Sequence, residues 1–196
     1  RAVVEWFSSR KSCFDMADLN HLDWDGEAIR LFGQMSGDNR KTLKIEKVSA
    51  APYLKLRHEN AIFDHIKDPS FLKYIKRKIR KLEKDFTVVF KTVQTGEELN
   101  RYFPDFVKLN VMRSRDKLQR GIFRNDKVVG MFQRIARQFL NEGLLRFHVL
   151  LLDREVVACL FNFIWKKKEY FYQSGIDLAY RKYSVGHLCH FYAIRS

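Results

Sequence analysis

The part of this sequence best suited to bind an anion lies between positions 181 and 188. It follows an apolar stretch that predicts a strand and leads directly into a predicted amphipathic helix. The first N–H groups of a helix have no partner within it, and the positive end of its dipole lies there, so anions bind at such starts. Gly186 lets an anion approach the backbone closely. We therefore predict a phosphate site formed by Arg181, Lys182, Ser184, Val185, Gly186, His187 and Leu188.

The same stretch also fits an ordinary strand, turn and helix. In that interpretation Ser184 is the N-cap of the helix, and Gly186 is tolerated in its first turn. The residues upstream favour the phosphate site, because they predict the elements that would position it.

Three side chains near the predicted strands could take a proton from a substrate: His148, Glu155 and Asp177. Imidazole and carboxylate groups are the usual general bases of enzymes. His148 occupies an alternating position of a strand and also fits a packing role. Asp177 also fits a carboxylate that caps a loop. The sequence leaves both alternatives open.

The cysteine and histidine spacings predict neither a metal site nor a disulfide framework. Cys13, Cys159 and Cys189 are unevenly spaced and form no C-x-x-C pair, which is typical of a reducing cytoplasm. His187 and His190 lie one helical turn apart but lack a carboxylate or cysteine at ligand spacing. No apolar run approaches the roughly 18 residues needed to cross a bilayer. We expect a cytoplasmic protein without a metal.

Residues 144–176 predict three antiparallel strands joined by tight polar turns, over 144–152, 156–165 and 170–176. Each run is rich in β-branched, aromatic and leucine residues and is bounded by charged residues. A helix is predicted over about 126–142. The order is therefore helix, three-stranded meander, phosphate loop and helix.

A basic amphipathic helix is predicted over residues 67–84, where apolar residues recur at helical spacing. It contributes strongly to a formal net charge of +14, from 37 Lys and Arg against 23 Asp and Glu. A solvated face with extended lysines is one interpretation. The other is attraction of an anionic partner, such as the phosphates of a cofactor, an anionic acceptor, a membrane surface or nucleic acid.

The remaining elements are predicted from shorter patterns. Residues 1–11 predict a helix end, 13–22 a strand, 25–35 a short helix, and 41–56 strand structure broken at Ala51-Pro52. A strand is predicted over 86–93, and a helix over 97–113 that Pro104 should kink or interrupt.

The segment Arg181-Lys182-Tyr183-Ser184-Val185-Gly186 resembles the Arg/Gln-x-x-Gly-x-Gly/Ala pyrophosphate loop of the GNAT acyl-CoA N-acyltransferases. Ser184 replaces the first glycine, and serine is not expected to adopt the backbone angles open to glycine. A serine preceded by tyrosine is similar to the loop of the Fem-like and cellulose-biosynthesis-associated branch. The run over 144–158 and the pattern Tyr172-x-x-Gly175-x-Asp177 resemble the same branch, and the resemblance covers about residues 50–196.

This resemblance implies a mixed α+β fold of the GNAT type, with an antiparallel meander, flanking helices and truncation at both ends. Residues 1–56 would be the end of a first GNAT-like half, 57–85 a basic connecting helix, and 86–196 a second GNAT-like domain that lacks its last strands. The backbone of Gln173, Ser174, Gly175 and Ile176 would contact the pantetheine arm of the donor and the developing oxyanion.

The activity implied is transfer of an acetyl or other acyl group from acyl-CoA to an amine on a small molecule, a sugar or a cell-envelope precursor. Specific DNA is not an expected partner, whereas the helix over 67–84 could meet a membrane or another anionic partner. Two alternatives stay open: a Fem-like transferase that uses aminoacyl-tRNA, and a non-catalytic basic module that binds nucleic acid or an anionic surface.

Overall fold

The computed structural model describes residues 22, 25–34, 44–47, 52–56, 66–116 and 121–196. The chain divides into two compact units, Arg1–Tyr53 and Leu54–Ser196. In the first, helix α2 (Glu27–Gln34) confirms the helix expected over 25–35. Residues 44–47 and 52–56 form neither helix nor strand, so the strand expected across 41–56 is wrong there. The helix end expected over 1–11 lies outside the described residues, and so does the strand expected over 13–22, except for Leu22, which forms neither helix nor strand.

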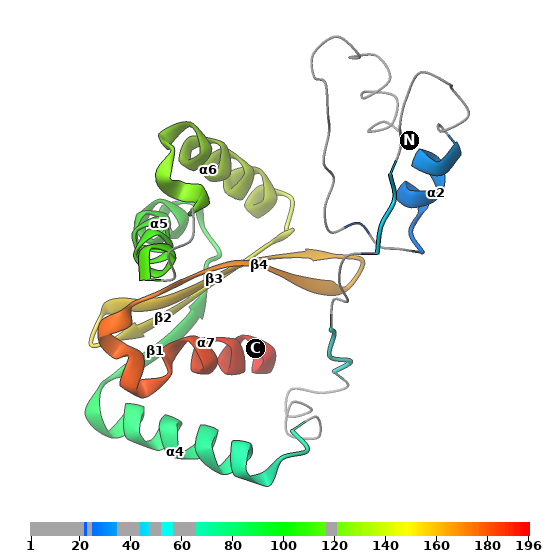
Figure 1. The fold of residues 1–196 in the computed structure, drawn as a ribbon. Helices are drawn as coiled ribbons and strands as arrows, with labels where there is room; N and C mark the ends of the chain where they lie inside the picture. The colour runs from blue at the N-terminus through cyan, green and yellow to red at the C-terminus, as the bar shows by residue number, and fades with distance from the viewer. Residues whose placement is uncertain (1–21, 23–24, 35–43, 48–51, 57–65, 117–120) are drawn as a thin grey trace. The chain divides into compact units, whose positions relative to one another are not determined.

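The second unit is built on a four-stranded antiparallel sheet (Figure 1). Its strands are β1 (Val88–Thr92), β2 (Leu145–Leu152), β3 (Glu155–Trp165) and β4 (Lys168–Ile176), in the spatial order β1-β2-β3-β4. The predicted meander is thereby confirmed. Both of its turns place two charged residues at positive φ, Asp153-Arg154 and Lys166-Lys167, which matches the twist of tight hairpins.

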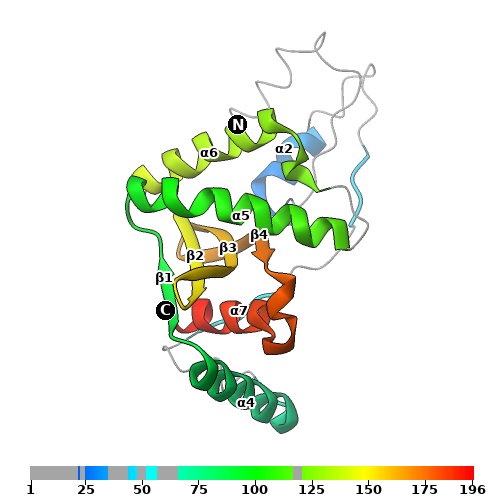
Figure 2. The same cartoon turned by 90° about the vertical axis from the view of Figure 1, so that its left-hand side faces the viewer.

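One face of the sheet is covered by α5 (Gly96–Asp116), the short 3₁₀ helix η2 (Ile122–Arg124) and α6 (Asp126–Asn141). Figure 2 shows this layer above the sheet. Phe106 of α5 contacts the rings of Phe147 and Phe161, which lie on β2 and β3. Pro104 does not interrupt the helix, so that part of the expectation is wrong: α5 is one continuous helix with this proline inside it.

The opposite face is covered by α7 (Val185–Arg195), and α4 (Pro69–Asp85) packs against α7 below it in Figure 2. The basic helix expected over 67–84 is confirmed, and Ile75 and Leu82 are its buried apolar positions. Helix α7 is less amphipathic than expected, because only His187 and Arg195 of its residues are exposed. Helices packed on a four-stranded antiparallel sheet make the fold α+β, as predicted.

Candidate functional site

Strand β4 is the last strand of the sheet within the described residues, and part of its backbone points away from β3. The N–H of Asp177 donates to the carbonyl of Val157 at 2.8 Å, so these residues form a hydrogen-bonded pair. Because such pairs alternate along antiparallel strands, Gly175 is the next residue directed at β3. The N–H groups of Ser174 and Ile176 therefore face the open side of the sheet.

A β-bulge lies just before this stretch. Gln173 pairs with Phe161, whereas Phe171 pairs with Asn162, so Tyr172 is an extra residue of β4. A bulge leaves one residue out of the ladder, increases the local twist and re-aims the strand that follows. It therefore sets the direction in which the backbone after Gln173 leaves the regular sheet.

Helix α5 lies unusually close to β4 at Gly175. A Cβ atom on this glycine would lie 2.8 Å from the Cβ of Leu109 and 2.9 Å from the carbonyl oxygen of Phe106. Glycine is required here because any larger residue would separate helix and strand. The sequence prediction placed Gly175 at a donor site but did not predict this packing role.

Two side chains of α5 hold the part of β4 that directly follows the bulge. The amide of Asn110 donates to the carbonyl of Ser174 at 2.9 Å and to Oε1 of Gln173 at 3.2 Å. The guanidinium of Arg113 donates to Oγ of Ser174. These bonds occupy the carbonyl of Ser174 at the open edge of the sheet. They do not engage the outward N–H groups of Ser174 and Ile176.

After β4 the chain enters a 3₁₀ helix, η3 (Leu178–Tyr183), and then α7. Oδ1 of Asp177 accepts a hydrogen bond from the N–H of Ala179 at 2.9 Å, so this carboxylate caps η3. The first hydrogen bond of α7 runs from the N–H of Leu188 to the carbonyl of Ser184 at 3.1 Å. The N–H groups of Val185, Gly186 and His187 precede it and have no partner within the helix, as at any helix start.

Ser184 adopts a left-handed conformation, with φ 60° and ψ 38°. The expectation that serine would not take the glycine conformation of this loop is therefore wrong. A non-glycine residue in this region costs about 1–3 kcal/mol. Ser184 precedes α7 without capping it through its side chain, because its hydroxyl lies 2.5 Å from the hydroxyl of Tyr74 on α4.

Gly186 faces the end of β4 rather than open solvent. A Cβ atom at this position would lie 2.6 Å from Cδ1 of Ile176. Its lack of a side chain therefore lets the first turn of α7 pack on β4. The sequence assigned Gly186 to close approach of an anion, and the structure gives it a packing reason as well.

Helix α4 makes two further contacts with this turn. The hydroxyl of Tyr183 donates to Oδ2 of Asp85 at 2.9 Å, and the ammonium group of Lys78 donates to the carbonyl of Lys182. The basic helix α4 therefore helps to hold the turn between β4 and α7 in place.

His148 lies in a buried polar network on the face of the sheet that α7 covers. Its side chain stacks on Phe90, and the residue is 1% exposed. Nδ1 lies 2.9 Å from Oγ1 of Thr92, and Nε2 lies 2.9 Å from Oε1 of Glu169. The same carboxylate oxygen accepts a hydrogen bond from Nδ2 of Asn162 at 2.6 Å. Hydroxyl, imidazole, carboxylate and amide thus form one chain of hydrogen bonds.

Glu169 is a potential functional residue that the sequence analysis did not single out. Its side chain is 34% exposed, so the network reaches solvent through this carboxylate. Burial acts to raise the pKa of Glu169, but hydrogen bonds from His148 and Asn162 outweigh it and hold that pKa below its usual value. The available signal was Asn162, a polar residue within an apolar strand, because buried polar groups require partners.

Glu155 and Asp177, the other two predicted bases, lie together and apart from His148. Both line a shallow hollow of about 180 Å³ on the α5 side of the sheet, which Arg101, Asp105 and Lys108 also line. The structure therefore separates the three predicted bases into two clusters on opposite faces.

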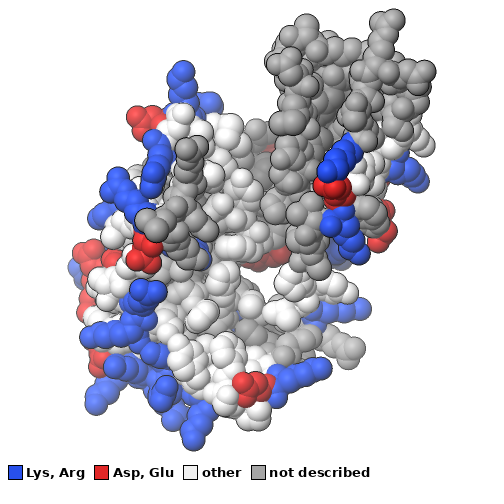
Figure 3. Space-filling model, viewed as in Figure 1, with Lys and Arg blue, Asp and Glu red and all other residues white. Residues whose placement is uncertain are grey.

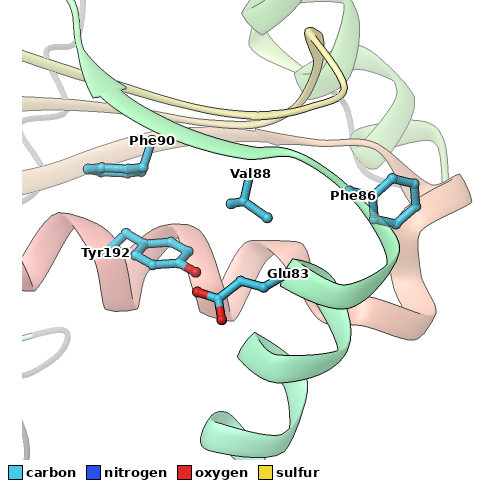
Figure 4. A pocket seen from close by; sticks show the side chains of 5 residues that line it. All are labelled: Glu83, Phe86, Val88, Phe90 and Tyr192. Atoms are coloured by element: carbon cyan, nitrogen blue, oxygen red, sulfur yellow. The ribbon is translucent and has the colours of Figure 1, made fainter.

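A second hollow, of about 320 Å³, lies between the end of α4, β1 and α7 (Figure 4). It is lined by Glu83, Phe86, Val88, Phe90 and Tyr192. The hydroxyl of Tyr192 is buried and has no hydrogen-bond partner within the described residues. Burial raises the pKa of Tyr192, and the nearby carboxylate of Glu83 raises it further. This hollow adjoins β1, at the opposite edge of the sheet from β4.

The described residues contain no group of three or more His, Cys, Asp and Glu side chains placed to hold a metal ion. Within the same parts of the chain, no helix combines the length and the apolar character needed to cross a membrane. Burial raises the pKa values of both described cysteines, Cys159 and Cys189. Their thiols are therefore poorly suited to act as nucleophiles.

Comparison with known proteins assigns the second unit to a family. No curated protein matches the chain significantly. The family pattern described as an acetyltransferase (GNAT) domain matches residues 69–196, from the first residue of α4 to the last residue of the sequence. The match spans the sheet, both helical layers and the turn between β4 and α7. The chain therefore belongs to the GNAT acetyltransferase family.

Proposed function

We propose that the protein is an N-acyltransferase that moves an acetyl or other acyl group from acyl-CoA to an amine. The observation that carries this proposal is the end of β4. There, the outward backbone of Ser174 and Ile176 leads into the free N–H groups at the start of α7. A donor that carries both a pyrophosphate and an amide-containing arm can use both features at once.

The two ends of the donor have different partners in this proposal. Its pyrophosphate binds the N–H groups of Val185, Gly186 and His187, where the helix dipole also favours negative charge. Its pantetheine arm pairs with the outward backbone of β4. The acyl group then points back along β4 toward the bulge at Tyr172, where a backbone N–H stabilises the developing oxyanion.

We assign the general base to Glu169, with His148 holding its carboxylate in position. The lowered pKa keeps this carboxylate ionised near neutral pH, and its exposed part can reach a substrate. Asn162, which contacts Glu169, pairs with Phe171 immediately beside the bulge. Asp177 fits the role less well because it caps η3, at the phosphate end of the donor.

The finer assignment to the Fem-like branch is part of the proposal and rests on Tyr183 and Ser184. Both residues carry the resemblance, and both are hydrogen-bonded to α4, which gives a physical reason for replacing the usual glycine. For the acceptor we propose an amine on a small molecule, a sugar or a cell-envelope precursor.

The test combines donor binding with catalysis. Hydrogen–deuterium exchange with and without CoA should show protection of peptides that cover 173–188, with no change in peptides that cover 126–141. Acetyl-CoA should release thiol only when an accepted amine from the panel is present. Protection elsewhere, or the absence of amine-dependent thiol release across the panel, would contradict the proposal. Transfer from aminoacyl-tRNA but not from acetyl-CoA would identify the alternative donor.

Three glutamine variants test the base. Glu169→Gln should lower kcat by about 10²- to 10⁴-fold with little change in the KM for acetyl-CoA. Glu142→Gln, at the far end of α6, is the matched control and should retain the kcat of the parent protein. If Glu155→Gln rather than Glu169→Gln abolishes turnover, the base lies on the other face of the sheet.

A further inference from the structure

Positive charge is concentrated around the turn that supports the start of α7. Helices α4 and η3 together carry nine Lys and Arg residues but only two acidic ones, Glu83 and Asp85. Figure 3 shows blue side chains gathered at the lower left of the molecule, over these two elements. The basic members are Lys73, Lys76, Arg77, Lys78, Arg80, Lys81, Lys84, Arg181 and Lys182.

Four of these cations contact the rings of two tyrosines. Tyr183 belongs to the turn itself, and Tyr74 is hydrogen-bonded to it. The ammonium groups of Lys182 and Lys81 lie 5.0 and 5.4 Å from the ring centre of Tyr183. The charged groups of Lys78 and Arg77 lie 5.4 and 5.9 Å from that of Tyr74. Because Tyr74 contacts Ser184 through its hydroxyl, the second pair of cations is fixed relative to the start of α7.

No carboxylate neutralises the cations nearest the turn. Within the described residues, Lys81, Arg181 and Lys182 form no ion pair. The carboxylate of Asp85 accepts a hydrogen bond from the hydroxyl of Tyr183, and Glu83 lines the hollow beside Tyr192. Attraction to an aromatic ring contributes about 0.5–1 kcal/mol at an exposed site, which does not remove the repulsion between neighbouring like charges. The arrangement is complementary to an external anion.

We propose that Lys81, Lys182 and Arg77 bind a second phosphate of the donor, a phosphate monoester separate from the pyrophosphate at α7. This inference rests on the proposed function. A phosphate monoester carries about −1.5 to −2 charges near neutral pH, so it demands more positive charge than one helix start provides. Acyl-CoA carries such a group on the 3′ position of its ribose, next to the pyrophosphate. Helix α4 is then part of the donor site.

The test compares CoA with 3′-dephospho-CoA, which keeps the pyrophosphate and loses only the monoester. Isothermal titration calorimetry on the parent protein should give at least tenfold tighter binding of CoA, about 1.4 kcal/mol. Lys81→Gln, Lys182→Gln and Arg77→Gln should each weaken CoA binding several-fold and leave 3′-dephospho-CoA binding within about twofold. Lys127→Gln, on α6, is the matched control and should change neither affinity.

Each other outcome has a definite meaning. If the parent protein binds neither ligand, the proposed function fails. If it binds both equally, the donor stands and the second phosphate site is overturned. If the α4 and η3 variants weaken both ligands equally, the cations act on the pyrophosphate or the fold, which also overturns it. Binding of anionic vesicles that requires Lys81, with no preference for CoA over 3′-dephospho-CoA, would assign this face to a membrane instead. Thermal unfolding of every variant checks that the fold is retained.

Discussion

The hydroxyl oxygens of Ser184 and Tyr74 lie 2.5 Å apart and join the turn after β4 to the basic helix α4. Ser184 holds a left-handed conformation that favours glycine, and the residue before it is bound to the same helix through Asp85. The hydrogen bond stabilises the folded state, whereas the strained backbone destabilises it. The turn thus has, at a position whose backbone conformation favours glycine, a serine that makes a specific contact to α4.

Ser184→Gly and Ser184→Ala should separate these two contributions. Glycine removes the backbone strain and the hydrogen bond together, so the free energy of unfolding should change by less than about 1 kcal/mol. Alanine keeps the strain and loses the bond, and should destabilise the protein by about 1 kcal/mol. Urea denaturation measures both. Tyr74→Phe should reproduce the loss in Ser184→Ala and add nothing to it in the double variant.

Gly186→Ala should destabilise the protein by about 1–3 kcal/mol, because the new methyl group would lie 2.6 Å from Cδ1 of Ile176. Ile176→Val removes that carbon atom. The double variant should therefore regain part of the stability lost in Gly186→Ala, as measured by thermal or urea unfolding. Strict additivity of the two single changes would show that the contact does not explain the glycine.

Gly175→Ala should be at least as destabilising, and truncation of a side chain should not rescue it. The obstacle includes the backbone carbonyl of Phe106 at 2.9 Å, which cannot move without α5. Gly130→Ala is the matched control, because the nearest side-chain atom is 3.7 Å away and the site lies inside α6. There, alanine should stabilise the protein by about 0.5–1 kcal/mol.

The lowered pKa of Glu169 predicts a specific acid dependence of stability. Its ionised form is stabilised in the folded state, so its contribution is fully present above the ordinary pKa of 4.5 and is lost as pH falls through the lower folded value. The free energy of unfolding should therefore decrease as pH falls from 4.5 through the lower folded-state pKa, and Glu169→Gln should reduce that slope. Equal slopes for parent and variant in urea titrations across this range would contradict the assignment.

Much of the sheet and its helices could be predicted because their signals are local. The strands of the meander alternate apolar runs with charged turns, and the predicted and observed bounds agree within about two residues, as is usual at element ends. The interruption predicted at Pro104 was wrong because the interaction that decides the outcome there is not local. The packing of α5 on the sheet outweighs the loss of one hydrogen bond, and local propensity does not include that packing.

The candidate site was less predictable because its contacts join distant segments. Glu169 was assigned to a turn, and nothing in its neighbourhood in the sequence shows that it meets His148. The contacts of Tyr74 with Ser184 and of Asp85 with Tyr183 likewise connect α4 with a turn about one hundred residues later. The helix start at α7, by contrast, is a local feature and was identified from the sequence.

Two chemically identical changes, Tyr192→Phe and Tyr183→Phe, should have opposite effects on stability. The hydroxyl of Tyr192 is buried and has no partner within the described residues, so its removal ends an unfavourable desolvation and should stabilise the protein by about 1 kcal/mol. The hydroxyl of Tyr183 donates to Asp85 at 2.9 Å, so its removal should destabilise the protein by about 1 kcal/mol. Both tyrosines lose only one oxygen atom, so each variant controls for the other in urea denaturation at neutral pH. A loss of stability in Tyr192→Phe would mean that a water molecule joins its hydroxyl to Glu83, and Glu83→Gln should then change the effect of Tyr192→Phe.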